Sequence, residues 1–507
     1  MTGKDKGRVD WPSFGASIAV IVLVCAPLAV FPEAGGRLLQ TCYAFISDRF
    51  GFLYAVAGLG VFLLLAWLAF GRFGKVKLGR DEDEVEYSDF SWVAMLFCAG
   101  VGAGLLYWAM IEWSYYYDSP PFDAAPRSPQ AVEWASTYGI FHWGVTAWCF
   151  YCLPTLAIAY PYYVKRVPYL RFSTGCNYFL GGGKETAAGR FIDLFFMIAL
   201  LGGAGSSLGF STPMIAACIA HLTGLPANFG LEVFTVLICV ALFGTSVWFG
   251  LNRGIKRLSN VNMIAAFAML IFVFFAGPTL FMLKTSGNSI LVMLQNFPKM
   301  NWWTDLFTDS AFFRDWTVFY WAWWIAYAPF VGLFATRISR GRTIRQVIIG
   351  MTVYGSLGGG LFYMILGNFG LHLELSGALS VTEIAGNAGE PAAIVSILDQ
   401  LPLSSLVIVV FAILSVIFSA TTYDSASYTL ASSATLRLEA GEDPARWHRL
   451  FWAITLTLLP LTLMSIGGLK VMQTVVLIVS LPILVIGVVM SVALVRQVSA
   501  DQRRGTK

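Results

Sequence analysis

The chain has 507 residues, of which 57% are hydrophobic and only 12% are charged; its mean hydropathy is +0.70 and its formal net charge is +4. This composition excludes an ordinary soluble protein, because the apolar surface exceeds what a water-facing fold can cover. The small net charge gives no indication of a nucleic-acid partner. We therefore predict a polytopic membrane protein in contact with lipid.

Continuous apolar runs, long enough to cross a hydrocarbon core of roughly 30 Å, recur along the whole chain. Their pattern excludes a β-barrel, whose strands would alternate in hydropathy, and favours helices with internally bonded backbone. The sequence predicts an all-α protein with twelve transmembrane helices, at about residues 13–31, 52–70, 91–115, 138–160, 191–220, 231–250, 260–283, 317–336, 346–371, 403–433, 450–467 and 471–495.

The distribution of basic residues gives this count a second test. We place the N-terminus in the cytoplasm and assign the segments between spans alternately to the outer and the cytoplasmic side. The cytoplasmic segments then carry most of the 33 Lys and Arg residues. Such an excess is what the positive-inside rule predicts. Both termini are therefore expected to be cytoplasmic, and the first span is interpreted as a retained helix because it lacks an A-x-A-like cleavage site.

The third predicted span contains three alternating glycines, Gly100, Gly102 and Gly104, where membrane helices usually have bulky residues. Glycine lowers the cost of leaving helical geometry, and interrupted helices expose backbone groups to substrates and ions in transporters. This pattern predicts a broken helix. A close helix crossing through small residues is the alternative.

Aromatic residues concentrate in the fourth and eighth spans. Trp316, Tyr320, Trp323, Trp324 and Tyr327 recur at helical spacing and form one aromatic face. Several rings together attract quaternary ammonium groups through the ring quadrupole, although a tryptophan belt at the lipid headgroups or simple packing would produce a similar pattern. The fourth span adds a second aromatic group, Trp143, Trp148 and Tyr151, with Gly144 loosening the turn.

Few ionisable residues lie inside the spans. Glu112 and Asp424 do, and structural pairing is expected for both because burying a carboxylate is costly. The eight cysteines and four histidines show no clustering typical of a metal site, so we predict neither a catalytic residue nor a bound cofactor.

The residues quoted so far resemble those of the betaine/choline/carnitine transporter family. The resemblance rests on WTVFYWAWW followed by PFVGLFATRISRGRT, on the G-x-G-x-G of the third span, and on HW…AW..Y of the fourth, and it covers essentially the whole chain. Both carnitine-type and sodium-coupled glycine betaine-type members look similar. The resemblance implies a homotrimer in the bacterial inner membrane, and a five-plus-five inverted-repeat core.

This resemblance implies a division of the chain into five parts. An N-terminal segment with two peripheral helices precedes the first repeat of spans three to seven; a connecting surface helix then leads to the second repeat of spans eight to twelve and a short cytoplasmic tail. The expected boundaries are 1–90, 91–285, 286–315, 316–495 and 496–507.

The family's substrate site transfers to this sequence position by position. The implied aromatic box comprises Trp143, Trp148, Tyr151 and Trp324, with Trp323 stacking beside them, Tyr115 lining the same cavity, and Trp316 and Tyr327 along the path to it. Backbone N–H groups at Gly100, Gly102 and Gly104 would face a substrate carboxylate.

Ion coupling is where the sequence departs from the carnitine antiporters it resembles. Those members replace the ion with an arginine and a methionine, whereas Asn262 and Val331 stand at these positions here. Sodium-coupled members use a hydroxyl pair that corresponds to Thr421 and Thr422, and a hard cation prefers oxygen ligands. The expected sodium site comprises Thr421, Thr422 and the backbone near Cys98 and Val101. The alternative is that the threonines only bond the preceding helical turn.

These observations predict a carrier that takes up a trimethylammonium or related onium zwitterion by sodium symport. The alternative mechanism is ion-independent exchange of the carnitine/γ-butyrobetaine type. A gated channel, which would show flux that does not saturate, and a membrane-embedded enzyme are other classes, but the spans lack the Ser/His or Cys/His/Asp constellation that an enzyme needs.

Overall fold

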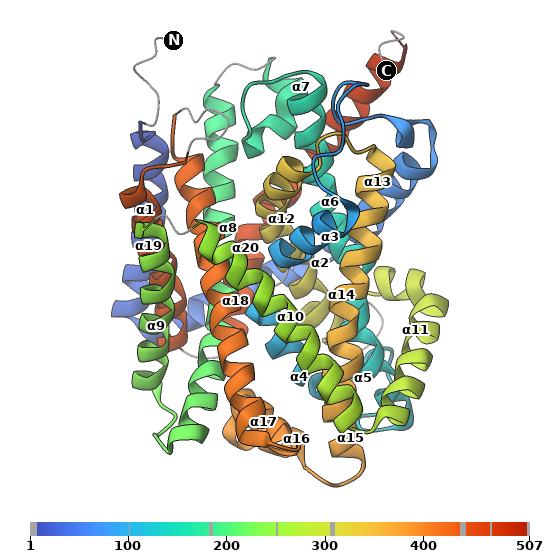
Figure 1. Cartoon of the computed structure of the whole chain (residues 1–507), viewed down its shortest axis with the longest axis vertical. Helices are drawn as coiled ribbons and strands as arrows, with labels where there is room; N and C mark the ends of the chain where they lie inside the picture. The colour runs from blue at the N-terminus through green and yellow to red at the C-terminus, as the bar shows by residue number, and fades with distance from the viewer. Residues whose placement is uncertain are drawn as a thin grey trace.

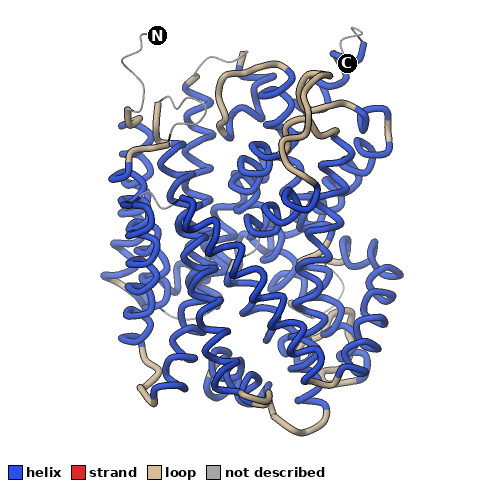
Figure 2. Tube along the Cα trace, viewed as in Figure 1, coloured by secondary structure: helices blue, strands red, loops and turns tan. Residues whose placement is uncertain are grey.

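The computed structural model describes residues 8–100, 102–181, 186–249, 252–304, 310–436, 443–466 and 469–503. Helices dominate this part of the chain, and it contains two isolated β-bridges but no strand (Figure 2). The all-α prediction is therefore confirmed for the residues described. The cause is physical: in a hydrocarbon environment the backbone must bond within its own segment.

The helices of the N-terminal half are α1 (Trp11–Val30), α2 (Pro32–Phe70), α3 (Asp89–Gly100), α4 (Ala103–Asp118), α5 (Pro129–His142), α6 (Val145–Ala159), α7 (Asn177–Leu180), α8 (Ala187–Thr223), α9 (Phe229–Phe249), α10 (Asn252–Ala276) and α11 (Thr279–Trp302). Those of the C-terminal half are α12 (Val318–Ile338), α13 (Ile344–Ile349), α14 (Gly355–Phe362), α15 (Asn368–Leu375), α16 (Val381–Ala388), α17 (Glu390–Asp399), α18 (Ser404–Ser433), α19 (Arg446–Ile466) and α20 (Leu469–Arg503). Short π-helical segments join some of them, among them Phe313–Thr317 before α12 and Tyr363–Gly367 between α14 and α15.

Where they are described, the predicted apolar stretches fall on helical segments, either on one helix or on several consecutive ones such as α13 to α15. Within the described residues, eight helical segments are long and apolar enough to cross a membrane, and a ninth qualifies if the bent pair α10 and α11 counts as one span. The structure thus supports a protein that crosses the membrane several times. The count of twelve and the inverted repeat stay predictions.

One boundary was wrong. The predicted span 260–283 ends early, because α10 stops at Ala276 and the chain turns by 111° before α11 begins at Thr279. Gly277 and Pro278 occupy the corner, and proline has no N–H with which to continue a helix. The predicted connecting segment 286–315 therefore starts inside α11, and its residues 305–309 lie outside the described part of the chain.

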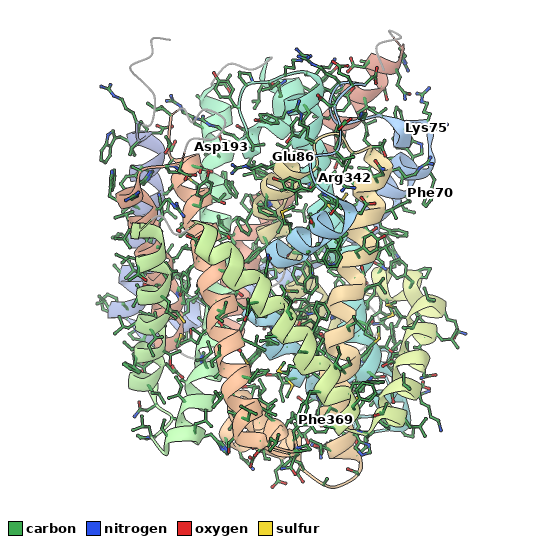
Figure 3. All side chains as sticks on the ribbon, viewed as in Figure 1. Phe70, Lys75, Glu86, Asp193, Arg342 and Phe369 are labelled. Carbon is green, nitrogen blue, oxygen red and sulfur yellow. The ribbon has the colours of Figure 1, made fainter. Side chains whose placement is uncertain are left out.

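The chain termini lie at one end of the helical bundle. α1 begins and α20 ends at the same end of the molecule, where α7 also lies, whereas α16 and α17 cover the opposite end (Figure 1). The labelled charged residues Lys75, Glu86, Asp193 and Arg342 gather toward the end with the termini, and Phe369 lies near the other (Figure 3).

The arginines after α12 form ion pairs and hydrogen bonds at the end of the bundle where the termini lie. Arg342 is buried, donates to Asp89 at 2.6 Å, and lies 4.2 Å over the ring of Trp92. Arg340 pairs with Asp83 at 2.9 Å. Hydrogen bonding by the backbone N–H of Arg80, followed by the Arg340 guanidinium, lowers the pKa of the partly buried Asp83 carboxyl.

Helix α12 occupies the middle of the bundle. It packs against α6, α8 and α20, and nearly all of its side chains are buried (Figure 1). Because neighbours surround it, its tryptophans contact protein and do not form a belt in the lipid. This placement excludes a lipid belt for the tryptophans of α12 and leaves simple helix packing as the alternative to a binding site.

Candidate functional site

The third predicted span is broken at its glycines. α3 ends at Gly100 and α4 begins at Ala103, with Gly102 extended at φ −120° and ψ −168°. Any residue can adopt this backbone, so conformation alone does not require glycine there. Val101 lies outside the described residues.

Close approach explains these glycines better than backbone freedom does. A Cβ on Gly100 would lie 2.6 Å from the ring of Trp148, and a Cβ on Gly104 would lie 3.2 Å from the ring of Trp323. A Cβ on Gly102 would lie 3.0 Å from the Thr422 hydroxyl oxygen. The glycines therefore let the interrupted backbone approach both the aromatic rings and α18.

The fourth predicted span is also interrupted. α5 ends at His142 and α6 begins at Val145, so Trp143 and Gly144 form the joint between them. Gly144 has φ −94° and ψ −148°, and a Cβ there would lie 2.5 Å from the carbonyl oxygen of Ile140. The expectation that Gly144 loosens this turn is confirmed.

The four predicted box residues come together between α6 and α12. The Trp143 and Trp324 rings have centroids 4.7 Å apart at 80°, and the Tyr151 and Trp324 rings are 5.7 Å apart at 88°. Trp148 stands 5.5 Å from Tyr151 at 88°. These near-perpendicular, edge-to-face contacts pack the four rings into one cluster, and a group of aromatic rings is what attracts a cation.

Trp323 extends this box along α12. Its ring stacks on Trp324 at 5.6 Å and 11°, and lies 6.0 Å from Trp143. The indole N–H of Trp324 donates to the carbonyl of His142 at 2.8 Å, which fixes the ring against the joint between α5 and α6. The box is thus held by backbone as well as by packing.

The remaining predicted aromatic residues lie outside the four-ring box. Trp316 and Tyr115 pack together at 4.7 Å, and the Tyr115 hydroxyl donates to Glu390 on α17. Tyr327, further along α12, contacts Phe330 at 5.9 Å and approaches Gly203 of α8. The predicted place of Tyr115 in the lining of the cavity, and those of Trp316 and Tyr327 along the path to it, stay predictions.

The predicted sodium ligands have their own intrahelical partners. The hydroxyls of Thr421 and Thr422 each donate to the carbonyl of Phe418 at 2.9 Å. Their oxygens still have lone pairs to offer a cation. Cys98 belongs to α3, but its side chain lies outside the described residues, as does the whole of Val101.

Serines of α8 are near this region, and the sequence reasoning missed them. The Ser207 oxygen would lie 3.7 Å from a Cβ on Gly102 and 3.4 Å from one on Gly104. Ser211 and Ser419 share a hydrogen bond at 3.3 Å between α8 and α18. The small-residue run GGAGSS at 202–207 was the available signal for a close, polar helix face.

The two carboxylates predicted inside the spans both have partners; Glu112 is completely buried, whereas Asp424 is 15% exposed. Asp424 of α18 pairs with Arg449 of α19 at 3.0 Å. Glu112 of α4 accepts from the hydroxyls of Tyr116, Tyr320 and Tyr363. Tyr363 is 251 positions from Glu112, so no local sequence pattern predicts their contact.

Helix α14 forms a further wall that the sequence analysis did not identify. A Cβ on Gly355 would lie 2.1 Å from the indole of Trp148, so this ring is sandwiched between Gly355 and Gly100. We predict that Gly355→Ala displaces Trp148 and lowers onium uptake at least tenfold, because a rigid indole and two helices have little room to move. Uptake into proteoliposomes measures this effect.

Gly359→Ala is the matched control on the same helix. Its added Cβ would meet Trp143 at 3.5 Å or more, which is an ordinary van der Waals distance. It should retain most of the uptake. Equal losses in both variants would show that helix α14 tolerates no side chain, whatever its distance from Trp148.

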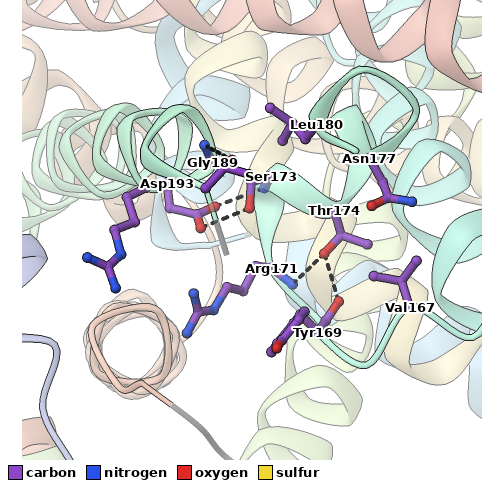
Figure 4. Close-up of a pocket in the computed structure, with 11 residues that line it drawn as sticks. Val167, Tyr169, Arg171, Ser173, Thr174, Asn177, Leu180, Gly189 and Asp193 are labelled. Atoms are coloured by element: carbon purple, nitrogen blue, oxygen red, sulfur yellow. Dashed lines mark hydrogen bonds between the residues drawn. The ribbon is translucent and has the colours of Figure 1, made fainter. Parts of the chain in front are cut away.

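A separate pocket lies away from the box, beside the start of α8 (Figure 4). Its polar groups bond one another: Asp193 accepts from the Ser173 backbone and hydroxyl at 2.8 and 2.9 Å, and Thr174 accepts from the backbone of Arg171 at 3.3 Å. None of its 11 lining residues belongs to the aromatic box.

Comparisons with known proteins agree on the family. A family model described as "BCCT, betaine/carnitine/choline family transporter" matches residues 12–503. The chain is 37% identical over 439 residues, 86% of this chain and 91% of the relative, to "Uncharacterized transporter YeaV" of Escherichia coli (strain K12). It is 32% identical over 486 residues, 96% of this chain and 88% of the relative, to a "Carnitine transporter" of Acinetobacter baumannii.

Among solved structures, one match is titled "Substrate-bound outward-open state of a Na+-coupled sialic acid symporter reveals a novel Na+-site". It covers 90% of this chain and 82% of that chain, at 13% identity and a TM-score of 0.42.

Proposed function

Because the chain belongs to the betaine/carnitine/choline transporter family, we propose that it takes up an onium zwitterion such as glycine betaine, carnitine or γ-butyrobetaine. Members of this family are transporters and not enzymes. The observation that carries the proposal is the box of Trp143, Trp148, Tyr151 and Trp324. A cation without N–H groups cannot be held by hydrogen bonds, and several π-faces at once provide the attraction instead.

The substrate carboxylate needs a second set of contacts. A helix start favours negative charge, and the first turn of α4 begins at Ala103; of its N–H groups, that of Leu105 already donates to the Gly102 carbonyl at 3.1 Å. Gly104 brings this turn against Trp323. We propose that a zwitterion lies with its onium head in the box and its carboxylate toward the start of α4.

For coupling we propose sodium symport, with the hydroxyls of Thr421 and Thr422 among the ligands. The proximity of Gly102 to Thr422 supports this site, because extended backbone beside a hydroxyl pair offers several oxygens to a hard cation. The sodium ion would be carried with the substrate and is not a resident cofactor.

Ion-independent exchange is the second candidate. It is favoured by the hydrogen bonds of both threonines to Phe418, since hydroxyls that stabilise their own helix need no ion. The "Carnitine transporter" relative is compatible with either mechanism. We place the protein in a bacterial inner membrane with both termini in the cytoplasm, and the homotrimer stays a prediction.

Uptake into proteoliposomes tests function and mechanism together. Labelled glycine betaine and carnitine are supplied with or without an inward sodium gradient, and with or without substrate preloaded inside. Accumulation that needs sodium but no preloading supports symport, and uptake that needs preloading but ignores sodium supports exchange. Failure to transport either substrate under all four conditions would refute the proposed substrate class.

A further inference from the structure

Glu112 is completely buried, with 0% of its surface exposed, and lies among phenol groups. One carboxylate oxygen accepts from Tyr116 at 2.5 Å; the other accepts from Tyr320 at 2.5 Å and from Tyr363. These donors come from α4, α12 and the π-helical segment Tyr363–Gly367. Because all three hydroxyls donate, the Glu112 carboxyl is the hydrogen-bond acceptor, and it links three separate helical segments.

This carboxylate has no cationic partner of its own in the part of the chain that the structure describes. His142 is the one basic group within 4 Å, with Nδ1 at 3.7 Å from Glu112. A neutral imidazole satisfies all its contacts: Nδ1–H donates to the Tyr116 oxygen at 2.9 Å, since that hydroxyl's proton goes to Glu112, and Nε2 accepts from Thr317 at 3.1 Å.

A single layer of rings separates this carboxylate from the aromatic box. Tyr320 lies 6.1 Å from Trp324, nearly parallel at 24°, and also 6.1 Å from Trp143. Tyr363 lies 5.9 Å from Trp143. Two of the three phenols that donate to Glu112, Tyr320 and Tyr363, therefore also lie next to Trp143 of the box, and Tyr320 lies next to Trp324 as well.

We propose that Glu112 is the counter-charge of the transported onium cation, and that it makes the box select a permanent positive charge over an uncharged group of the same shape. This inference rests on the proposed function. A buried carboxylate and a buried cation are each costly alone, and in a medium of low dielectric each offsets the cost of the other across the intervening rings. The contribution comes through charge, so Glu112 acts as a specificity residue without touching the substrate.

The test compares two ligands of nearly equal shape in Glu112→Gln. Glycine betaine carries a quaternary nitrogen, and 3,3-dimethylbutanoate has carbon in its place. Affinities of both are measured on the purified full-length protein by competition against labelled glycine betaine. We expect the wild-type preference for the charged ligand to fall about tenfold in the variant, because the carboxylate charge is lost and the side-chain shape is kept.

Asp48→Asn is the control for net charge, since Asp48 is half-exposed on α2 and pairs with Arg314 at 2.7 Å. It should leave the preference unchanged. Should Glu112→Gln fail to fold, the double variant Tyr320→Phe with Tyr363→Phe keeps both rings and removes two donors. One oxygen of Glu112 then lacks both donors that hold the carboxylate behind the box, so the preference for the charged ligand should fall likewise.

Two results would overturn the inference. One is an unchanged preference for the charged ligand in a folded Glu112→Gln protein; the other is an equal loss of affinity for both ligands, which a purely structural role would produce. If the wild-type protein binds no onium ligand at all, the proposed function has failed before Glu112 is tested, so the two failures are distinguishable.

Discussion

Trp324→Leu is expected to weaken binding of glycine betaine and carnitine by about 5- to 30-fold, equivalent to ~1–2 kcal/mol for a desolvated cation–π contact. Trp324 is only 4% exposed, and its ring contacts the rings of both Trp143 and Tyr151. Replacing it therefore removes the contact that these two residues have in common. Leucine keeps an apolar side chain but has no π-face. Equilibrium binding of labelled substrate to purified protein measures the change.

Two further variants separate cation binding from packing. Trp324→Phe keeps a smaller ring and should fall between wild type and leucine. Trp302→Leu changes an exposed tryptophan on α11 and should leave affinity unchanged. Thermal unfolding shows whether each variant is folded. A folded Trp324→Leu protein that binds with wild-type affinity would remove the aromatic box from the proposed function.

Much of this fold follows from local sequence. Lipid forces backbone to bond within its own segment, so each long apolar run had to be helical, and the structure confirms this for the described residues. The aromatic residues of α12 could also be placed on one face, because helical spacing fixes which side chains are neighbours. Resemblance to the family then paired Trp324 with Trp143, Trp148 and Tyr151, and the structure brings them together.

What the sequence could not predict depends on contacts between distant segments. The approach of Gly355 to Trp148 joins α14 to α6, and no local pattern encodes that distance. Tyr363 and Glu112 are 251 positions apart and share a hydrogen bond. The glycines of the third span were expected to break the helix, and it is interrupted between Gly100 and Ala103; their close approach to Trp148, Trp323 and Thr422 was not expected. Their small size was the relevant property, and only the neighbours reveal it.

The corner between α10 and α11 illustrates another limit. Hydropathy continues across Gly277 and Pro278, so a window average sees one span to residue 283, whereas proline lacks the N–H that would carry the helix on. Local stereochemistry outweighed the apolar run there. The end of a helix inside a long apolar stretch therefore depends on a few residues. Their effect is lost when hydropathy is averaged over a window.

Thr421→Ala combined with Thr422→Ala is expected to abolish the stimulation of uptake by an inward sodium gradient, while sodium-free uptake stays the same. A sodium ion needs several oxygen ligands, and removing two hydroxyls leaves too few beside Gly102. Helix α18 should tolerate the change. Each hydroxyl donates to the carbonyl of Phe418 in the preceding turn, and alanine has the higher helix propensity. Uptake with and without the gradient measures the effect.

Two controls decide what a loss of stimulation means. Thr421→Ser with Thr422→Ser keeps both hydroxyls and should keep the response to sodium. Thr429→Ala removes a hydroxyl that bonds the preceding turn of the same helix in the same manner, to Ser425 at 2.8 Å, and should also keep it. Sodium stimulation that survives in the double alanine variant would place the ion elsewhere. If the wild type itself ignores sodium and needs preloaded substrate, exchange is the mechanism, and the threonines are helix-stabilising residues alone.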